Sequence, residues 1–147
     1  MGMLTDFFVA SDEDAGAYES RLLADDESSE DDLRSLERVE HKGLTGIELG
    51  ALWALLADKK FSYPEFGLQV GPMTEESEGI LEAFPSDFTR RLAQLPQGSI
   101  PGLSTGWADV DGVPHEADEL VPILQDLKRL AQAAQSTGRS LYMWYSI

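Results

Sequence analysis

The residues best suited to acid–base chemistry in this sequence lie in one short turn that is rich in carboxylates. His115 is preceded by Asp109 and Asp111 and is followed by Glu116. Histidine titrates near neutral pH and a neighbouring carboxylate orients its ring, so this turn suits a general base or a metal ligand. The alternative is a surface histidine ahead of a helix, where acidic residues interact favourably with the positive end of the helix dipole. The second histidine, His41, has the same two interpretations at the end of an expected strand.

Other catalytic motifs are absent from the sequence. The chain has no cysteine, which excludes disulfides, thiol nucleophiles and cysteine-ligated zinc or iron–sulfur centres. It contains neither the G-x-S-x-G pattern of serine hydrolases nor the glycine-rich patterns that bind nucleotide phosphates. Carboxylates are so numerous that close pairs are expected by chance, which gives no support to a glycosidase or a carboxylate metal site. The sequence therefore predicts no cofactor and no metal site.

Aromatic residues suggest a second kind of site. The segment from residue 59 to 73 has proline, glycine and isolated aromatics but no clear period, which is typical of a lid or a binding loop. Its side chains Phe61, Tyr63 and Phe66, together with Trp107, are candidates for contact with a ligand or a partner. The alternative is that these aromatics pack into the core, as loop aromatics commonly do.

Charge is the compositional extreme of this chain. Asp and Glu number 27 and Lys and Arg 11, which gives a formal net charge of −16. Direct binding to nucleic-acid phosphates or to anionic lipid needs a basic patch, so we expect neither. An acidic surface suits a basic protein partner, as a docking surface or as a mimic of nucleic acid, unless the charge only maintains solubility. The most acidic stretch, residues 25–32, is predicted to be a mobile loop and lacks the glycine and final glutamate of an EF-hand.

Hydrophobic periodicity and capping signals predict the elements that position these residues. Thr45 and Glu48 form a capping-box pattern ahead of an apolar helix, and Pro85 with Ser86 is typical of another helix start. The expected order is β-α-β-α-β-α-α-α-β in a single domain covering residues 1–147. The strands are expected at 3–10, 35–41, 79–84 and 140–147, and the helices at 11–23, behind Thr45, at 87–95, from Ser99, and from about Asp118 to the stop at Gly138.

The C-terminal part carries the clearest architectural signal. Apolar residues recur every three or four positions from Leu120 to Ala134, which predicts a long amphipathic helix ended by Gly138. The strand that follows, residues 140–147, is apolar on both sides and is therefore expected inside the sheet. We accordingly expect an α+β domain with a small mixed sheet, the N- and C-terminal strands side by side, and helices packed against it.

Compartment signals are absent. No apolar run approaches the roughly 20 residues that a membrane-spanning helix needs. The first residues lack the basic and apolar segments of a secretory signal. These observations lead us to expect a soluble cytoplasmic protein that binds no membrane.

Three segments give the chain a family resemblance. Met1 to Leu4 running into Phe7 and Phe8, the leucine- and tryptophan-containing helix at Leu49–Leu56, and the helix and strand at Leu120–Ile147 are arranged as in YfbM-like proteins. The chain thus resembles the YfbM-like family of uncharacterised bacterial proteins at both ends, and less so between Lys59 and Gly112. This resemblance implies a small cytoplasmic α+β domain with no established activity and supplies no functional residues.

These observations favour a non-catalytic binding or interaction module, which could self-associate or bind a basic protein. A small enzyme with its site around His115 is the first alternative, and an acidic mimic of nucleic acid that binds a basic protein is the second.

Overall fold

The structure is a computed structural model of the whole chain. The structure describes residues 4–24, 27–28, 37–60, 68–71, 78–110, 113 and 115–146. The predicted acidic loop at 25–32 lies outside this description except for Glu27 and Ser28, which are exposed and helical. Three predicted aromatic contacts, Phe61, Tyr63 and Phe66, lie outside it as well.

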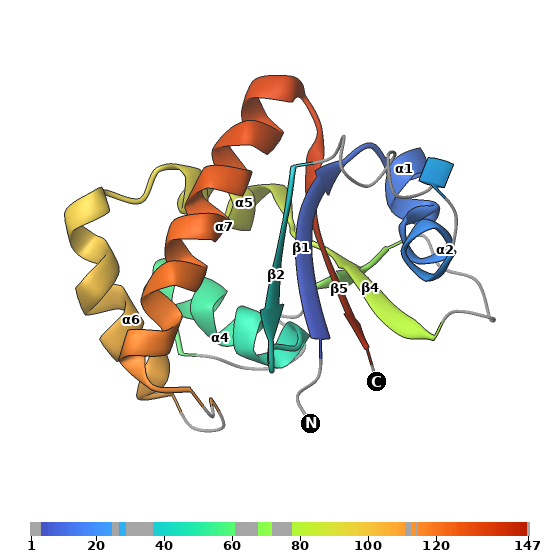
Figure 1. Cartoon of the computed structure of the whole chain (residues 1–147). Coiled ribbons are helices and arrows are strands. Elements are labelled where there is room, and N and C mark those ends of the chain that lie inside the picture. Colours follow the sequence, from blue (N-terminus) through green and yellow to red (C-terminus); the bar gives the residue numbers. More distant parts are fainter. Residues whose placement is uncertain are drawn as a thin grey trace.

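A twisted sheet forms the centre of the molecule (Figure 1). Its strands are β1 (Leu4–Ala10), β2 (Arg38–Lys42), β3 (Gln69–Val70), β4 (Gly79–Ala83) and β5 (Ser140–Ser146), in the spatial order β2-β1-β5-β4-β3. The predicted pairing of the N- and C-terminal strands is confirmed, because β1 and β5 pair from Thr5–Tyr145 to Ala10–Ser140.

The described pairings are all antiparallel, which corrects the expectation of a mixed sheet. The path of the chain explains this. The long helix α7 (Ala117–Thr137) runs beside β1 in the same direction, and the chain then reverses at Gly138, so β5 returns antiparallel to β1 (Figure 1).

Helices cover the two faces of the sheet unequally (Figure 1). One face carries α4 (Gly46–Leu56), α5 (Ser86–Ala93), α6 (Ile100–Ala108) and α7, with a short 3₁₀ turn at Gln97–Ser99 ahead of α6. The other face is covered by α1 (Asp12–Gly16) and α2 (Tyr18–Leu23). The expected single helix at 11–23 is thus divided at Ala17.

Both faces of the central strands are buried, as the apolar pattern of residues 140–147 predicts. Phe7 and Met143 pack under the larger helical layer, whereas Phe8 and Tyr142 pack under α1 and α2. All four side chains are at most 1% exposed. Burying a large apolar side chain contributes roughly 1.5–3 kcal/mol, so this strand pair is a major source of the fold's stability.

The helix ends follow from local chemistry. Thr45 caps α4 and forms the predicted capping box with Glu48. α7 begins at Ala117, one residue earlier than expected, and contains Pro122 near its start. It ends at Gly138, whose φ of 67° is left-handed and therefore favours glycine. Within the described ranges, no helix is long and apolar enough to cross a membrane.

Candidate functional site

His115 contacts two elements of the fold through its two ring nitrogens. Its Nε2 lies 2.8 Å from the carbonyl oxygen of Gly43, at the connection between β2 and α4. A carbonyl only accepts hydrogen bonds, so Nε2 carries a proton. Nδ1 lies 3.6 Å from a carboxylate oxygen of Glu119 in the first turn of α7. His115 therefore joins the β2–α4 connection to α7.

Neither Asp109 nor Glu116, the two described acidic residues of the predicted His115 site, forms an ion pair with the His115 ring. Asp109 is exposed at the C-terminal end of α6, and Glu116 is exposed at the N-cap of α7. The N–H of Glu116 donates to Glu119 at 3.2 Å, which satisfies a backbone group at the start of the helix. Asp111 lies outside the described residues.

The second histidine, His41, lies against a carboxylate of α7. Its Nε2 lies 2.9 Å from Oδ2 of Asp126 on α7, which leaves Nδ1 as the acceptor when the ring is neutral. Arg129 extends this contact, with nitrogen–oxygen distances of 3.6 Å to Asp126 and 3.2 Å to Glu37. The sequence gives no sign of this network because His41 and Asp126 are 85 positions apart.

Trp107 is a core residue and offers no surface to a ligand. It is completely buried, and its indole N–H donates to the carbonyl of Glu48 at 2.8 Å. This contact satisfies the polar edge of the ring inside the protein, as buried tryptophan requires. The core interpretation of Trp107 is therefore correct, and its proposed role in binding is not.

A pocket lies between the start of α5, the end of α7 and the start of β5. Its volume is about 150 Å³, and it is lined by Phe84, Ser86, Thr89, Gln135, Arg139 and Ser140. Phe84 is buried and supplies an apolar wall, while the remaining lining residues are polar or charged. This lining is more polar than that of most small-ligand sites, which are largely apolar, and it therefore favours a polar ligand.

Arg139 gives this pocket its charge. The residue is exposed, and its guanidinium makes no ion pair with any residue in the described part of the chain. Its backbone is fixed, because its N–H donates to the carbonyl of Ala134 at 2.9 Å behind the left-handed Gly138. The side chain thus starts from a defined position and remains available for a ligand.

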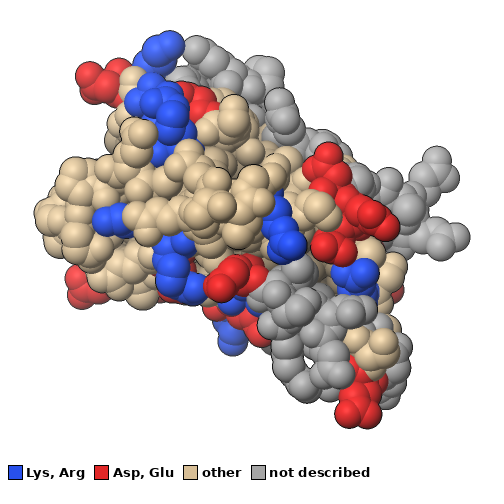
Figure 2. Space-filling view, turned by 90° about the horizontal axis from the view of Figure 1, so that it is seen from above, with Lys and Arg blue, Asp and Glu red and all other residues tan. Residues whose placement is uncertain are grey.

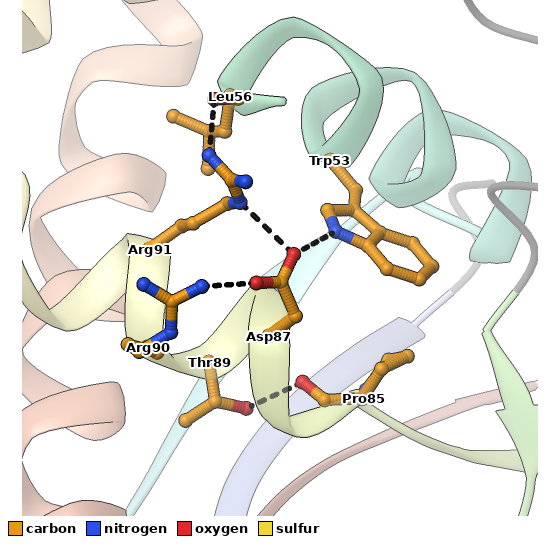
Figure 3. A network of polar contacts seen from close by, with 7 residues as sticks. All are labelled: Trp53, Leu56, Pro85, Asp87, Thr89, Arg90 and Arg91. Atoms are coloured by element: carbon orange, nitrogen blue, oxygen red, sulfur yellow. Dashed lines mark hydrogen bonds and ion pairs between the residues drawn. The ribbon is translucent and has the colours of Figure 1, made fainter. Parts of the chain in front are cut away.

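The only acidic residue of α5, Asp87, is engaged on the side of the helix that faces α4 (Figure 3). Its carboxylate accepts hydrogen bonds from Arg91 Nε at 2.9 Å and from Arg90, and Trp53 Nε1 lies 3.4 Å away. The hydrogen bond from Arg91 is the main reason that the pKa of Asp87 lies below its usual range. Thr89, which lines the pocket, lies on the other side of the helix (Figure 3). Its hydroxyl donates a hydrogen bond to the carbonyl oxygen of Pro85.

A metal site finds no support in these groups. Among the residues that the structure describes, no cluster of three or more His, Asp or Glu side chains could hold an ion.

Sequence reasoning identified parts of the pocket without joining them. Pro85 and Ser86 are predicted to start a helix. This prediction is correct, but the two segments that form the pocket, residues 84–89 and 135–140, are far apart in the chain. No local sequence pattern predicts that these segments lie side by side.

Comparison with known proteins finds a similarity to a solved structure. No protein-family model matches the chain, and no curated protein matches it. Among solved structures, the chain is similar to the crystal structure of YfbM from Escherichia coli, which is described as a protein of unknown function. The similarity covers 98% of this chain and 99% of that chain, with 16% sequence identity and a TM-score of 0.43. YfbM is also the protein after which the family of the sequence resemblance is named. The functional argument below uses this chain's own residues.

Proposed function

We propose that the protein is a non-catalytic binding protein that holds a small ligand in the pocket between α5, α7 and β5. The observation that carries this proposal is the presence of Arg139 beside a hollow, without an ion pair to any described residue. An arginine that is placed by fixed backbone but left unpaired is available to a ligand at little cost in reorganisation.

The volume of the pocket limits the ligand. About 150 Å³ is smaller than the roughly 300 Å³ at the lower end of pockets that enclose drug-sized molecules. The pocket therefore suits a small molecule, or one small group of a larger molecule whose remainder stays in solvent.

Binding is favoured over catalysis because both histidines already serve the fold. His115 holds the β2–α4 connection to α7, and His41 holds β2 to Asp126 on the same helix. Neither residue lines the pocket. A general base has to lie within hydrogen-bond reach of the substrate proton that it removes.

A pocket-filling substitution tests this function. Gln135 is exposed and lines the pocket, so Gln135→Trp should fill the hollow without changing the core. We expect small fragments, added as neutral, cationic and anionic sets, to shift the backbone NMR signals of Phe84, Thr89 and Ser140. In Gln135→Trp the affinity should fall by about tenfold or more because the ligand's volume is occupied.

The matched control is Gln125→Trp, which places the same ring on an exposed position of α7 outside the pocket. This variant should bind fragments as the unaltered protein does. The proposal is wrong if no fragment shifts the pocket signals, or if both tryptophan variants bind equally well.

A further inference from the structure

We infer that the group held in this pocket is a small oxyanion, a phosphate or a carboxylate, bound by the guanidinium of Arg139. This inference rests on the proposed function and names the chemical class of its ligand. Phosphate and carboxylate share the oxygen geometry that arginine's planar fork of N–H groups recognises in pairs.

The side chains around Arg139 supply donors for such a group. Ser86 at the start of α5 and Gln135 near the end of α7 contribute a hydroxyl and an amide to the pocket lining. No hydrogen bond joins either side chain to another described residue. Donors that are not used by the fold can turn toward anion oxygens without breaking an existing contact.

The backbone at the start of α5 also favours an anion in the pocket. α5 begins at Ser86 behind Pro85, which provides no side-chain cap for the first N–H groups of the helix. These groups give the beginning of α5 a partial positive charge. The opposite charge at the end of α7 is reduced, because the N–H groups of Gly138 and Arg139 donate to its last carbonyls.

Negative charge is kept out of the pocket in a very acidic protein. None of the described lining residues is Asp or Glu, although the chain contains 27 of them. The acidic residue nearest in sequence to the pocket residues of α5 is Asp87. Its carboxylate points toward Arg90, Arg91 and Trp53 (Figure 3). A carboxylate inside the pocket would repel an anion, and its exclusion removes that cost.

Titration with three simple probes tests the inference. Inorganic phosphate, acetate and acetamide are added separately at one fixed ionic strength, and binding is followed through the backbone NMR signals of Thr89 and Ser140. Acetate and acetamide have nearly the same shape, so the difference between their affinities measures the contribution of the negative charge. We expect phosphate or acetate to bind, acetamide to bind at least about tenfold more weakly, and the ratio of phosphate to acetate to identify the preferred source.

Two charge-removing variants complete the test. Arg139→Gln should weaken binding of the preferred anion by about tenfold or more, since the bidentate, charge-assisted hydrogen bonds are lost. Lys128→Gln removes the same charge from α7 at a residue outside the pocket and should leave the affinity within about twofold.

The outcomes separate this inference from the proposed function. If acetamide binds as well as acetate, or if Arg139→Gln and Lys128→Gln have equal effects, the oxyanion inference is wrong while the pocket remains a binding site. If neither these probes nor the neutral and cationic fragments shift the pocket signals, both are wrong.

Discussion

Two carboxylates, Asp6 and Glu82, are almost completely buried and each accepts a hydrogen bond from a tyrosine. Tyr18 donates to Asp6 at 2.6 Å, and Tyr145 donates to Glu82 at 2.6 Å. Burial is the main cause of a raised pKa at both carboxyls, and the tyrosine hydrogen bonds only partly offset it. These groups therefore couple the stability of the protein to pH.

Glu82→Gln is predicted to remove part of this pH dependence. Burial raises the folded pKa of Glu82 above the ordinary glutamate value of 4.5, so the folded state binds a proton more readily than the unfolded state. Its contribution to stability is therefore greatest below that value and is lost as the pH rises through the folded pKa. Glutamine keeps the oxygen that accepts from Tyr145 but carries no charge. Relative to the unaltered protein, the variant should gain stability on going from about pH 4 to about pH 7.

Denaturant unfolding at a series of pH values measures this change. Glu78→Gln, at an exposed residue just before β4, is the matched control and should follow the unaltered protein. A Glu82→Gln variant whose relative stability did not change with pH would contradict the account of its buried carboxylate.

At the scale of elements, the junction between α7 and β5 connects the fold to the pocket. Gly138 ends the helix with left-handed backbone, and the next two residues, Arg139 and Ser140, line the pocket. The same reversal places β5 beside β1 in the middle of the sheet. The position of Arg139 thus depends on the conformation of a single glycine.

Gly138→Ala is predicted to destabilise the protein by about 1 kcal/mol, because a Cβ disfavours left-handed backbone. Contact with the rest of the protein is not the cause, since a Cβ at Gly138 would meet no other described part of the chain within 4 Å. Gly138→Asn should lose less, because asparagine tolerates this conformation better. The measurement is the free energy of unfolding in denaturant.

Gly106→Ala provides the comparison for this prediction. Gly106 lies inside α6 and also has open space around its Cα, so alanine should stabilise the helix by roughly 0.5–1 kcal/mol. If alanine at Gly138 and alanine at Gly106 changed the free energy of unfolding equally, the left-handed backbone of Gly138 would not be the cause of the effect at the junction.

The elements that the sequence predicts best are those with long, regular patterns. α7 is predicted almost to the residue because its apolar stripe and Gly138 act together, and β5 because both of its sides are apolar. β3 was not predicted, since two residues are too few for a period. The direction of the strands was predicted wrongly, because hydrophobic patterns do not define how neighbouring strands run.

The candidate site is less predictable than the fold for a physical reason. His115 attracted attention because its acidic neighbours are close in sequence, yet its two nearest partners are Gly43 and Glu119. Arg139 attracted none, because its significance comes from Ser86 and Gln135 across the pocket and from what it does not contact. Local sequence shows which side chains are reactive, whereas only the fold shows which are unoccupied.

At the scale of the whole molecule, the net charge is −16, and Figure 2 shows how the described charges are arranged on one face. Figure 2 looks down on the end of the molecule where α7 gives way to β5. On this face the described acidic side chains form separate groups, with Lys and Arg between them and a broad uncharged area. A mimic of nucleic acid needs continuous rows of carboxylates at phosphate-like spacing, and the described part of this face offers none.

This distribution also affects the proposed ligand. An anion that approaches a strongly acidic protein is repelled at long range, and this repulsion is screened beyond about 8 Å at physiological ionic strength. The positive charge of Arg139, among lining side chains that carry no charge, then acts at short range. We therefore expect binding of the anion to depend on this pocket and not on the overall charge of the molecule.

A crystal structure of the protein soaked with selenate tests the central claim most directly. Selenate is a tetrahedral oxyanion like phosphate, and its selenium is located by anomalous scattering. The account predicts an anomalous peak in the pocket of Ser86, Gln135 and Arg139, with selenate oxygens about 2.7–3.2 Å from the guanidinium nitrogens. An empty pocket in a crystal whose selenate binds only at other positions would contradict it.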